Sequence, residues 1–317
     1  MSPAVEAVNQ TPTPAMAPPA VASSSNKSPF SGTTSPEAAN RAPHQAKNAK
    51  PATLLKRADW MFGLIVGIVV VGWLINLALG ALNRPNLMTD QLVGTFVLVK
   101  GGDFTMGCQD GLDSEFRDDE TPTHQVTLGT FYLGQTEVTQ AQWRAVMGNN
   151  PSSFGNCDAC PVELVSWEDI QVFLTKLNNR SGGARYRLPT ESEWEYAARG
   201  GQSSRGYVYA GGNTIDHVAW NESNSSDKTH PVKGKSANEL GLYDMSGNVW
   251  EWCSDWYGDY PHLAKVDPRG PASGSDRVLR GGGWGRGAGY CRVSFRGSSA
   301  PGNGSDAYGF RLCSSPQ

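Results

Sequence analysis

Apolar positions form one long uninterrupted run in the first third of the chain. The run extends from Trp60 to Leu82, "WMFGLIVGIVVVGWLINLALGAL", and its 23 residues include no charge. A helix rises about 1.5 Å per residue, so a run of this length can cross the roughly 30 Å hydrocarbon core of a bilayer. The run is too long for a cleaved signal peptide and starts too far from the N-terminus. The pattern therefore predicts a single transmembrane helix at 60–82.

After this run the hydrophobic pattern changes to short elements. The segments "TFVLVKGGDFTMG" (95–107) and "HQVTLGTFYLG" (124–134) alternate apolar and polar positions, or are apolar between Gly turns, as strands in hairpins are. Long Gly- and Asn-rich loops separate these elements. The pattern predicts a loop-rich α+β domain.

Three segments carry the sequence signals of short helices. Residues 139–148 predict a helix capped by Thr139. Residues 166–183 predict one that has Ser166 and Asp169 as a capping box and ends at Gly182-Gly183. Thr190 and Glu193 repeat the capping box at the start of a third helix. Large side chains on these helices are expected to pack in the core, and the same is expected of five tryptophans: Trp143, Trp167, Trp194, Trp250 and Trp252.

Composition separates the N-terminal part of the chain from the rest. The first 51 residues hold nine of the 20 prolines and few aromatic residues, so residues 1–56 are predicted to be a disordered tail. Four basic residues lie between positions 47 and 57, whereas only Arg84 follows the apolar run closely. The positive-inside rule then predicts a single-pass protein of the cell membrane, with a cytoplasmic N-terminus and a periplasmic or extracellular C-terminal domain.

The charge of the C-terminal part limits its partners. Residues 83–317 carry 21 Lys and Arg against 27 Asp and Glu, a net charge of −6. An acidic domain without a basic patch argues against nucleic acid as a partner. The membrane is therefore the one partner that composition predicts, and any protein or small-molecule ligand is unknown.

All six cysteines lie beyond the apolar run, on the side where disulfides persist. "CDAC" at 157–160 lacks the second CxxC of a zinc ribbon and is expected to form a local disulfide instead. Cys108 and Cys313, near the two ends of the domain, are a candidate pair for a second disulfide. Spacing alone does not fix the pairing.

Seven ordered motifs between residues 94 and 313 resemble the formylglycine-generating enzyme (sulfatase-modifying factor) family. In chain order the motifs are "GGDFTMG", "HQVTLGTFYLGQTEVT", "PVELVSWED", "YRLPTESEWEYAARGG", "ELGLYDMSGNVWEW", "RVLRGGGW" and "GFRL". The resemblance implies a C-type-lectin-like fold over 94–313, with little regular secondary structure.

The resemblance also implies a calcium site in "DMSGNVWEW". Its ligands would be the Asp244 side chain, the carbonyl groups of Gly247 and Val249, and the Glu251 carboxylate. Calcium accepts mixed carboxylate and carbonyl oxygens of this kind. The alternative is a tight turn whose carboxylates accept hydrogen bonds from backbone N–H groups.

For copper, the aligned positions of this chain differ from those of the resembled enzymes. The family's enzymes hold Cu(I) with two cysteines and use oxygen to convert a substrate Cys to formylglycine. Aligned on Arg296 and the final Gly-Phe-Arg, those two cysteines fall on Ala288 and Val293 of this chain. Cys291 lies between them and is the one weak catalytic candidate, since a single thiolate does not provide the pair of soft ligands that Cu(I) prefers. We expect Cys291 to be a buried or disulfide-bonded sulfur.

The C-terminal arrangement W-x6-C-R-x3-R-x4-P-x7-G-F-R-L is similar to the variable proteins of diversity-generating retroelements. Those proteins display variable residues on one face of the same fold to bind partners. Aromatic and arginine side chains are common anchors at such surfaces. The resemblance implies a ligand-binding face formed by six residues: Trp284, Arg286, Tyr290, Phe295, Arg296 and Tyr308.

Three functions are compatible with these observations. The absence of a copper cysteine pair favours a ligand- or protein-binding module over an enzyme. The alternative is a formylglycine-generating oxidoreductase that uses copper and O2, with a second cysteine reaching Cys291 from elsewhere in the fold. A structural subunit of an envelope complex is a third possibility.

Overall fold

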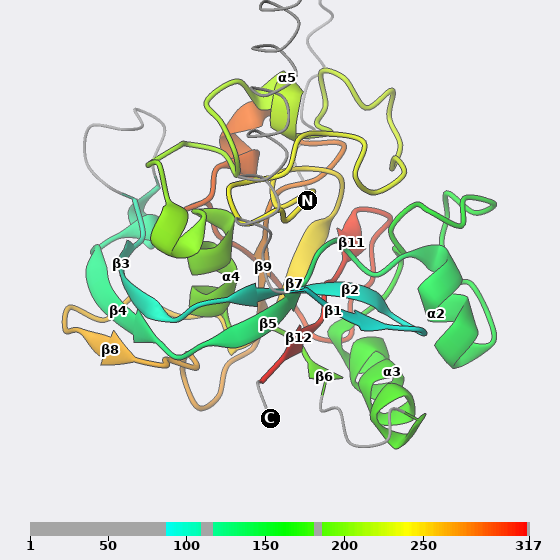
Figure 1. Cartoon of the computed structure of the whole chain (residues 1–317), viewed down its shortest axis with the longest axis horizontal. Coiled ribbons are helices and arrows are strands. Elements are labelled where there is room, and N and C mark those ends of the chain that lie inside the picture. The colour runs from blue at the N-terminus through cyan, green and yellow to red at the C-terminus, as the bar shows by residue number, and fades with distance from the viewer. Residues whose placement is uncertain (1–86, 109–116, 181–185, 316–317) are drawn as a thin grey trace, which may run out of the picture. The chain divides into compact units, whose positions relative to one another are not determined.

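The computed structural model describes residues 87–108, 117–180 and 186–315, which fall within one unit of the chain (Figure 1). Within these residues no helix is long and apolar enough to cross a membrane. The predicted tail (1–56) and the predicted transmembrane helix (60–82) lie outside the described residues, so both stay predictions.

Three sheets form the strand framework of the described residues. The first sheet has the order β1-β2-β5-β12-β6, and all its neighbouring strands are antiparallel. The second has the order β10-β9-β7-β11, in which β11 runs parallel to β7, and the third has the order β3-β4-β8. The strands of the first sheet are β1 Leu87–Asp90, β2 Gly94–Val99, β5 Phe131–Gly134, β12 Cys313–Ser314 and β6 Tyr186–Arg187. Those of the second are β10 Gly297–Ser299, β9 Arg277–Arg280, β7 Trp250–Trp256 and β11 Tyr308–Gly309. Those of the third are β3 Gly102–Met106, β4 His124–Leu128 and β8 Lys265–Val266.

Three of the four α-helices of the described residues form where the capping signals predict them, and the short fourth helix was not predicted. The α-helices are α2 Gln140–Met147, α3 Trp167–Arg180, α4 Glu191–Ala198 and α5 Ile215–Val218, and the 3-10 turns are η1 Asp118–Glu120, η2 Gly201–Ser203 and η3 Ala288–Cys291. Thr139 and Thr190 each accept a hydrogen bond from the backbone N–H three residues later, as N-cap residues do. Ser166 Oγ accepts from the Asp169 N–H at 3.1 Å, and the Asp169 carboxylate accepts from the Ser166 N–H at 3.0 Å. The predicted capping boxes and the predicted mixture of helices and strands are confirmed. The likeness to C-type lectins stays a prediction.

Two clusters of buried apolar side chains support these elements. In the first, α2 and α3 lie side by side (Figure 1). Between them, Trp143 stacks on Phe173 with ring centroids 5.1 Å apart. In the second, α4 packs against β3 and β7 and buries Trp194 completely. Four of the five tryptophans predicted for the core are buried, and Trp167 is partly buried against the first cluster.

Helix α4 is buried on every side although it carries three glutamates. Each glutamate forms an ion pair with an arginine. Glu191 pairs with Arg296 and Glu195 with Arg280, both from distant parts of the chain, whereas Glu193 pairs with Arg187, six residues before it. Burial raises the pKa of Glu191, but the charges of Arg296 and Arg280 outweigh it, so the pKa is lowered. A buried charge is tolerated when it is paired in this way. Helix α4 therefore ties β9 and the segment before β10 into the core.

The cysteines follow the sequence prediction only in part. Cys157 and Cys160 form a disulfide with an S–S distance of 2.00 Å, as predicted. The predicted bond between Cys108 and Cys313 is wrong, because Cys313 is a buried free thiol on β12, beside the Glu193 carboxylate at 3.8 Å. Position near the two ends of a domain does not bring two sulfur atoms together unless the strands also meet.

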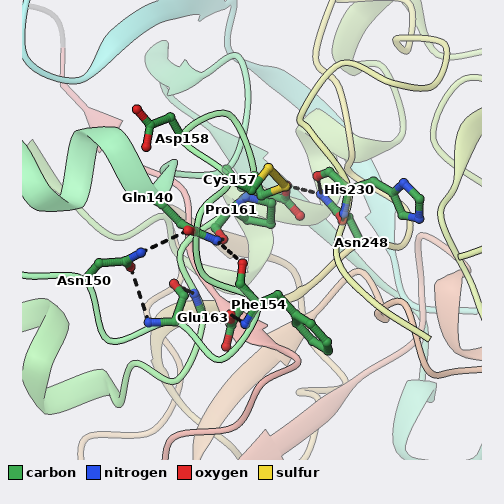
Figure 2. The surroundings of a disulfide bond; sticks show 12 residues. Gln140, Asn150, Phe154, Cys157, Asp158, Pro161, Glu163, His230 and Asn248 are labelled. Atoms are coloured by element: carbon green, nitrogen blue, oxygen red, sulfur yellow. Dashed lines mark hydrogen bonds between the residues drawn. A yellow bond between two sulfur atoms is a disulfide. The ribbon is translucent and has the colours of Figure 1, made fainter. Parts of the chain in front are cut away.

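The disulfide closes a loop after α2 that several side chains hold in place (Figure 2). Gln140 donates to the Phe154 carbonyl at 3.0 Å and accepts from Asn150 at 3.0 Å. The backbone N–H of Phe154 donates to Glu163 at 2.8 Å. The ring of Phe154 then meets the ring of Trp284 edge-on, with centroids 5.3 Å apart, so this loop supports the segment predicted to bind a ligand.

Candidate ligand-binding site

A cavity of about 300 Å³ opens on the face predicted from the C-terminal segment. Five of the six residues predicted there line the cavity, and they are Arg286, Tyr290, Phe295, Arg296 and Tyr308. The sixth, Trp284, does not line it. Its ring lies against Phe154, and its Nε1 donates a hydrogen bond to the Asp306 carbonyl at 3.0 Å. Trp284 therefore holds the loop rather than facing the cavity.

Short elements from the second sheet position the aromatic side chains. Tyr308 on β11 lies beside Trp250 on β7, because the two strands pair in parallel at these residues. The turn η3 ends at Cys291 and places Tyr290, 41% exposed, over Phe295 with ring centroids 4.9 Å apart. The Phe295 ring also lies 5.8 Å from that of Trp250. These contacts give the cavity an aromatic wall whose outer member, Tyr290, is accessible to a ligand.

The three arginines at the cavity differ in the ion pairs and hydrogen bonds that their guanidinium groups form within the domain. Arg296 donates to both carboxylate oxygens of Glu191, at 2.7 and 2.8 Å, and to the Asp119 carbonyl at 2.9 Å. It is a fixed part of the wall. Arg286 stacks over Tyr290 at 5.6 Å, and within the described residues its guanidinium forms no ion pair. Arg117 lies over Phe295 at 5.3 Å and pairs with Asp119 at 3.4 Å, with more than half of its side chain exposed.

Several residues of the cavity were missed by the sequence analysis, among them Arg117, Asp119 and Tyr257. These three come from segments far from the C-terminal motif. Tyr257 donates to the Asp119 carboxylate at 2.6 Å, and burial, with this hydrogen bond, raises the pKa of Tyr257 to about 12. No periodicity or motif spacing signals such a meeting, because it depends on the tertiary fold.

Cys291 lies beneath this face and is completely buried. Burial raises the pKa of its thiol to about 12, so the thiolate needed for nucleophilic attack is disfavoured. The chain approaches the sulfur closely at Gly282, where φ is +72° and a Cβ atom would lie 2.7 Å from Sγ. Ala288 and Val293, aligned with the copper cysteines of the resembled enzymes, flank it without a sulfur atom.

The groups predicted to bind calcium meet in a buried region centred on Glu251. Both of its carboxylate oxygens accept from Arg311 at 2.6 Å, and one also accepts from Trp194 Nε1 at 2.7 Å. Asp244 accepts from the Lys233 N–H at 2.8 Å through Oδ2, while its Oδ1 is buried without a hydrogen-bond partner in the described part of the chain. Burial raises the pKa of Asp244 to about 6.

These contacts fit a cation only in part. Asp244 Oδ1 is an oxygen without a donor, which a cation could use, but ligation by Glu251 would require the carboxylate to leave Arg311. Across the three described ranges, no three His, Cys, Asp or Glu side chains converge in a geometry that could hold a metal ion. A calcium ion here would depend on Asp244 and on backbone carbonyl groups.

A third acidic group in this region, Glu137, was missed by the sequence analysis. It is completely buried and accepts hydrogen bonds from the Val249 N–H at 3.1 Å and from Asn248 Nδ2 at 2.8 Å. Burial, followed by the charges of Asp244 and Glu251, raises the pKa of Glu137 well above its usual value. Of the motif's own two carboxylates, Asp244 accepts a hydrogen bond from a backbone N–H, that of Lys233, as the alternative prediction describes. The hydrogen bonds to Glu251 come from side chains instead.

Known proteins share sequence and fold with most of this chain. The chaperone protein LppX of Paenibacillus barcinonensis is 34% identical over 75% of this chain and 92% of its own length. The formylglycine-generating enzyme of Streptomyces coelicolor is 34% identical over 68% of this chain and 87% of its own length. Among solved structures, Treponema denticola variable protein 1 is 35% identical, covers 74% of this chain and all of its own length, and superposes with a TM-score of 0.65. Residues 84–316 match the sulfatase-modifying factor enzyme 1-like domain, and the chain belongs to that family.

Proposed function

We propose that this chain is a membrane-anchored, extracytoplasmic binding module of the sulfatase-modifying factor family. It would bind a protein or small-molecule ligand through the cavity lined by Arg286, Tyr290, Phe295, Arg296 and Tyr308. The predicted transmembrane helix at 60–82 would hold the domain at the membrane, with residues 1–56 in the cytoplasm. The disulfide between Cys157 and Cys160 supports an oxidising compartment for the domain.

The observation that carries the proposal is the meeting of aromatic and cationic side chains at one concave face. Tyr290 is 41% exposed over the Phe295 ring, and Arg286 stacks on Tyr290 without an ion pair of its own among the described residues. Tyr, Trp and Arg side chains contribute most of the free energy of binding at many interfaces. Arg296, held by Glu191, gives the face a rigid wall and so lowers the entropy lost on binding.

The state of Cys291 argues for binding rather than oxidation. A copper oxidase of the resembled type needs two accessible thiolates. Cys291 is fully buried, its pKa is raised to about 12, and the aligned enzyme positions hold Ala288 and Val293. Copper therefore forms no part of the proposal.

Calcium belongs to the proposal as a structural ion rather than as part of the ligand site. Its ligands would be Asp244, with Oδ1 as the anchoring oxygen, the carbonyl groups of Gly247 and Val249, and Glu251 if its carboxylate turns away from Arg311. Such an ion would stabilise the turn before β7. No step of binding depends on it.

A peptide-display selection tests the binding proposal. The full-length chain, kept in a non-ionic detergent, is the target, and selected peptides are then measured against two double variants. We expect Arg286→Ala with Tyr290→Ala to weaken binding at least tenfold, because it removes the accessible cation and its aromatic partner. Arg205→Ala with Tyr207→Ala is the matched control, because these two residues also interact with each other but lie outside the cavity.

The control pair should change the affinity less than twofold. Equal losses in the two double variants would show that the selected peptides bind elsewhere. A selection that enriches no peptide able to distinguish the two variants would contradict the proposal.

A further inference from the structure

A second cavity, of about 410 Å³, lies on the other side of the Arg296 wall. The loop after β7 encloses it together with the strand β4. Its walls are mainly apolar and include Met106 and three prolines, Pro261, Pro268 and Pro271. None of these groups belongs to the ligand-binding face described above, so the second cavity requires its own explanation.

The floor of this cavity carries one carboxylate that is only half satisfied. Asp255 is 4% exposed, and its Oδ2 accepts from the Glu191 N–H at 3.1 Å and from Ser254 Oγ at 2.8 Å. Its other oxygen, Oδ1, has no hydrogen-bond donor among the described residues. Oδ1 lies where the loop passes over the cavity, 3.3 Å from the place that a Cβ atom on Gly270 would take.

The charges around Asp255 are mostly neutralised by neighbours. Glu191 is held by Arg296, and Glu193 by Arg187. Burial, followed by the charges of Glu191 and Glu193, raises the pKa of Asp255 to about 7, and no cation lies within ion-pair distance of it in the described chain. Two arginines interact with Asp255 through their charge: Arg187, which pairs with Glu193, and Arg277, which stacks on Trp256 at 3.5 Å.

A second acceptor faces the same cavity. His124 is 5% exposed, and its Nδ1 lies 3.4 Å from the Pro122 carbonyl, which favours a proton on Nδ1 and a lone pair on Nε2. Burial lowers the pKa of His124, so the ring is neutral near pH 7. Lys265 and Arg269 line the cavity with exposed side chains at its rim, where they would disfavour a ligand with two positive charges.

We propose that this cavity binds the ammonium group of a small organic monocation. The ammonium group would donate to Asp255 Oδ1 and to His124 Nε2, while its apolar body would lie against Met106 and the prolines. A buried carboxylate with a free oxygen is stabilised by an ion partner, and apolar walls strengthen the pairing by excluding water. The site is separate from the proposed ligand face, although Arg296 borders both.

The test uses benzylammonium chloride as the probe, with benzyl alcohol and benzoate as uncharged and anionic probes of similar size. Isothermal titration of the full-length chain in a non-ionic detergent at pH 8 should show binding of benzylammonium, and binding of the other two at least tenfold weaker. Asp255→Asn, which keeps the shape of the side chain but removes the charge, should weaken benzylammonium binding at least tenfold. Asp259→Asn, at the exposed rim, is the matched control and should change the affinity less than threefold.

The pH dependence gives a second readout that needs no variant. Alkylammonium groups titrate near pH ~10, so the probe stays charged between pH 6 and 8. Asp255 loses its proton over this range, and the affinity of the native chain should rise severalfold as the pH increases. Burial lowers the pKa of His124, and loss of a proton from its ring with rising pH would also favour binding of an ammonium group, so His124 does not reverse the trend.

Three results would overturn the proposal: affinity unchanged in Asp255→Asn, a flat pH profile in the native chain, or tighter binding of benzoate than of benzylammonium. The double variant Arg286→Ala with Tyr290→Ala should leave benzylammonium binding unchanged. Failure at this cavity is therefore distinguishable from failure of the proposed binding face.

Discussion

Replacing Glu251 by Gln should destabilise the fold more than any exposed substitution would. Glu251 is 1% exposed, and both of its oxygens accept from Arg311, which is itself completely buried. The amide of Gln cannot balance the guanidinium charge, and a buried charge that loses its partner costs about 3–5 kcal/mol. In a domain of this size about 1 kcal/mol corresponds to roughly 2–4 °C in the melting temperature, so Tm should fall by roughly 6–20 °C.

The measurement is urea unfolding followed by tryptophan fluorescence, together with a thermal melt by circular dichroism. Glu168→Gln is the control, because Glu168 is an exposed glutamate in the first turn of α3, and its substitution should change the free energy of unfolding by at most about 0.5 kcal/mol. A loss below about 1 kcal/mol in Glu251→Gln would refute the reasoning, since the guanidinium would then be balanced by something other than this carboxylate.

Three further predictions follow from the buried side chains. Phe173→Ala removes a ring that stacks on Trp143 in the core and should lower the free energy of unfolding by about 3–5 kcal/mol, whereas Val172→Ala, at a 49% exposed neighbour, should lower it by at most about 0.5 kcal/mol. Similar losses for the two variants in urea unfolding would contradict the packing described. Cys291 should resist iodoacetamide in the native chain at pH 8 and react after denaturation, because the thiol is buried and its pKa is raised to about 12. Peptide mass measures the labelling, and rapid labelling of the native chain would show an accessible thiolate. If calcium binds at Asp244, 1 mM calcium should raise Tm of the native chain, EGTA should reverse the rise, and Asp244→Asn should remove the response. An unchanged Tm in the native chain would refute the calcium site.

The local signals in the sequence predict the helices well, because a cap and an apolar stripe act within one or two turns. Thr139, Ser166 and Thr190 begin their helices as predicted. The strands of two to four residues in the C-terminal part, such as β11 and β12, are too short to show a period. Pairing defines them: β11 pairs with β7, and β12 pairs with β5 and β6.

Residues of the candidate site that lie close together in the C-terminal segment could be predicted from the sequence. Residues that reach the site from other segments through the tertiary fold could not. Arg117 and Tyr257 reach the cavity from segments that carry no motif for it. The ion pair between Glu191 and Arg296 joins residues 105 positions apart, so no spacing rule could show it. The wrong pairing of Cys108 with Cys313 has the same origin, since disulfide geometry depends on tertiary contacts.

The central claim is that the domain binds through this face and does not oxidise a substrate thiol. Its most direct test is to load the reduced full-length chain, in a non-ionic detergent, with Cu(I) and incubate it with oxygen and a Cys-x-Pro-x-Arg peptide. The mass of the peptide is then compared with that from a working formylglycine-generating enzyme. We predict no conversion, because Cys291 is buried and Ala288 and Val293 provide no second thiolate. Conversion of the peptide cysteine to an aldehyde that is lost in Cys291→Ser would contradict the claim and identify an oxidase.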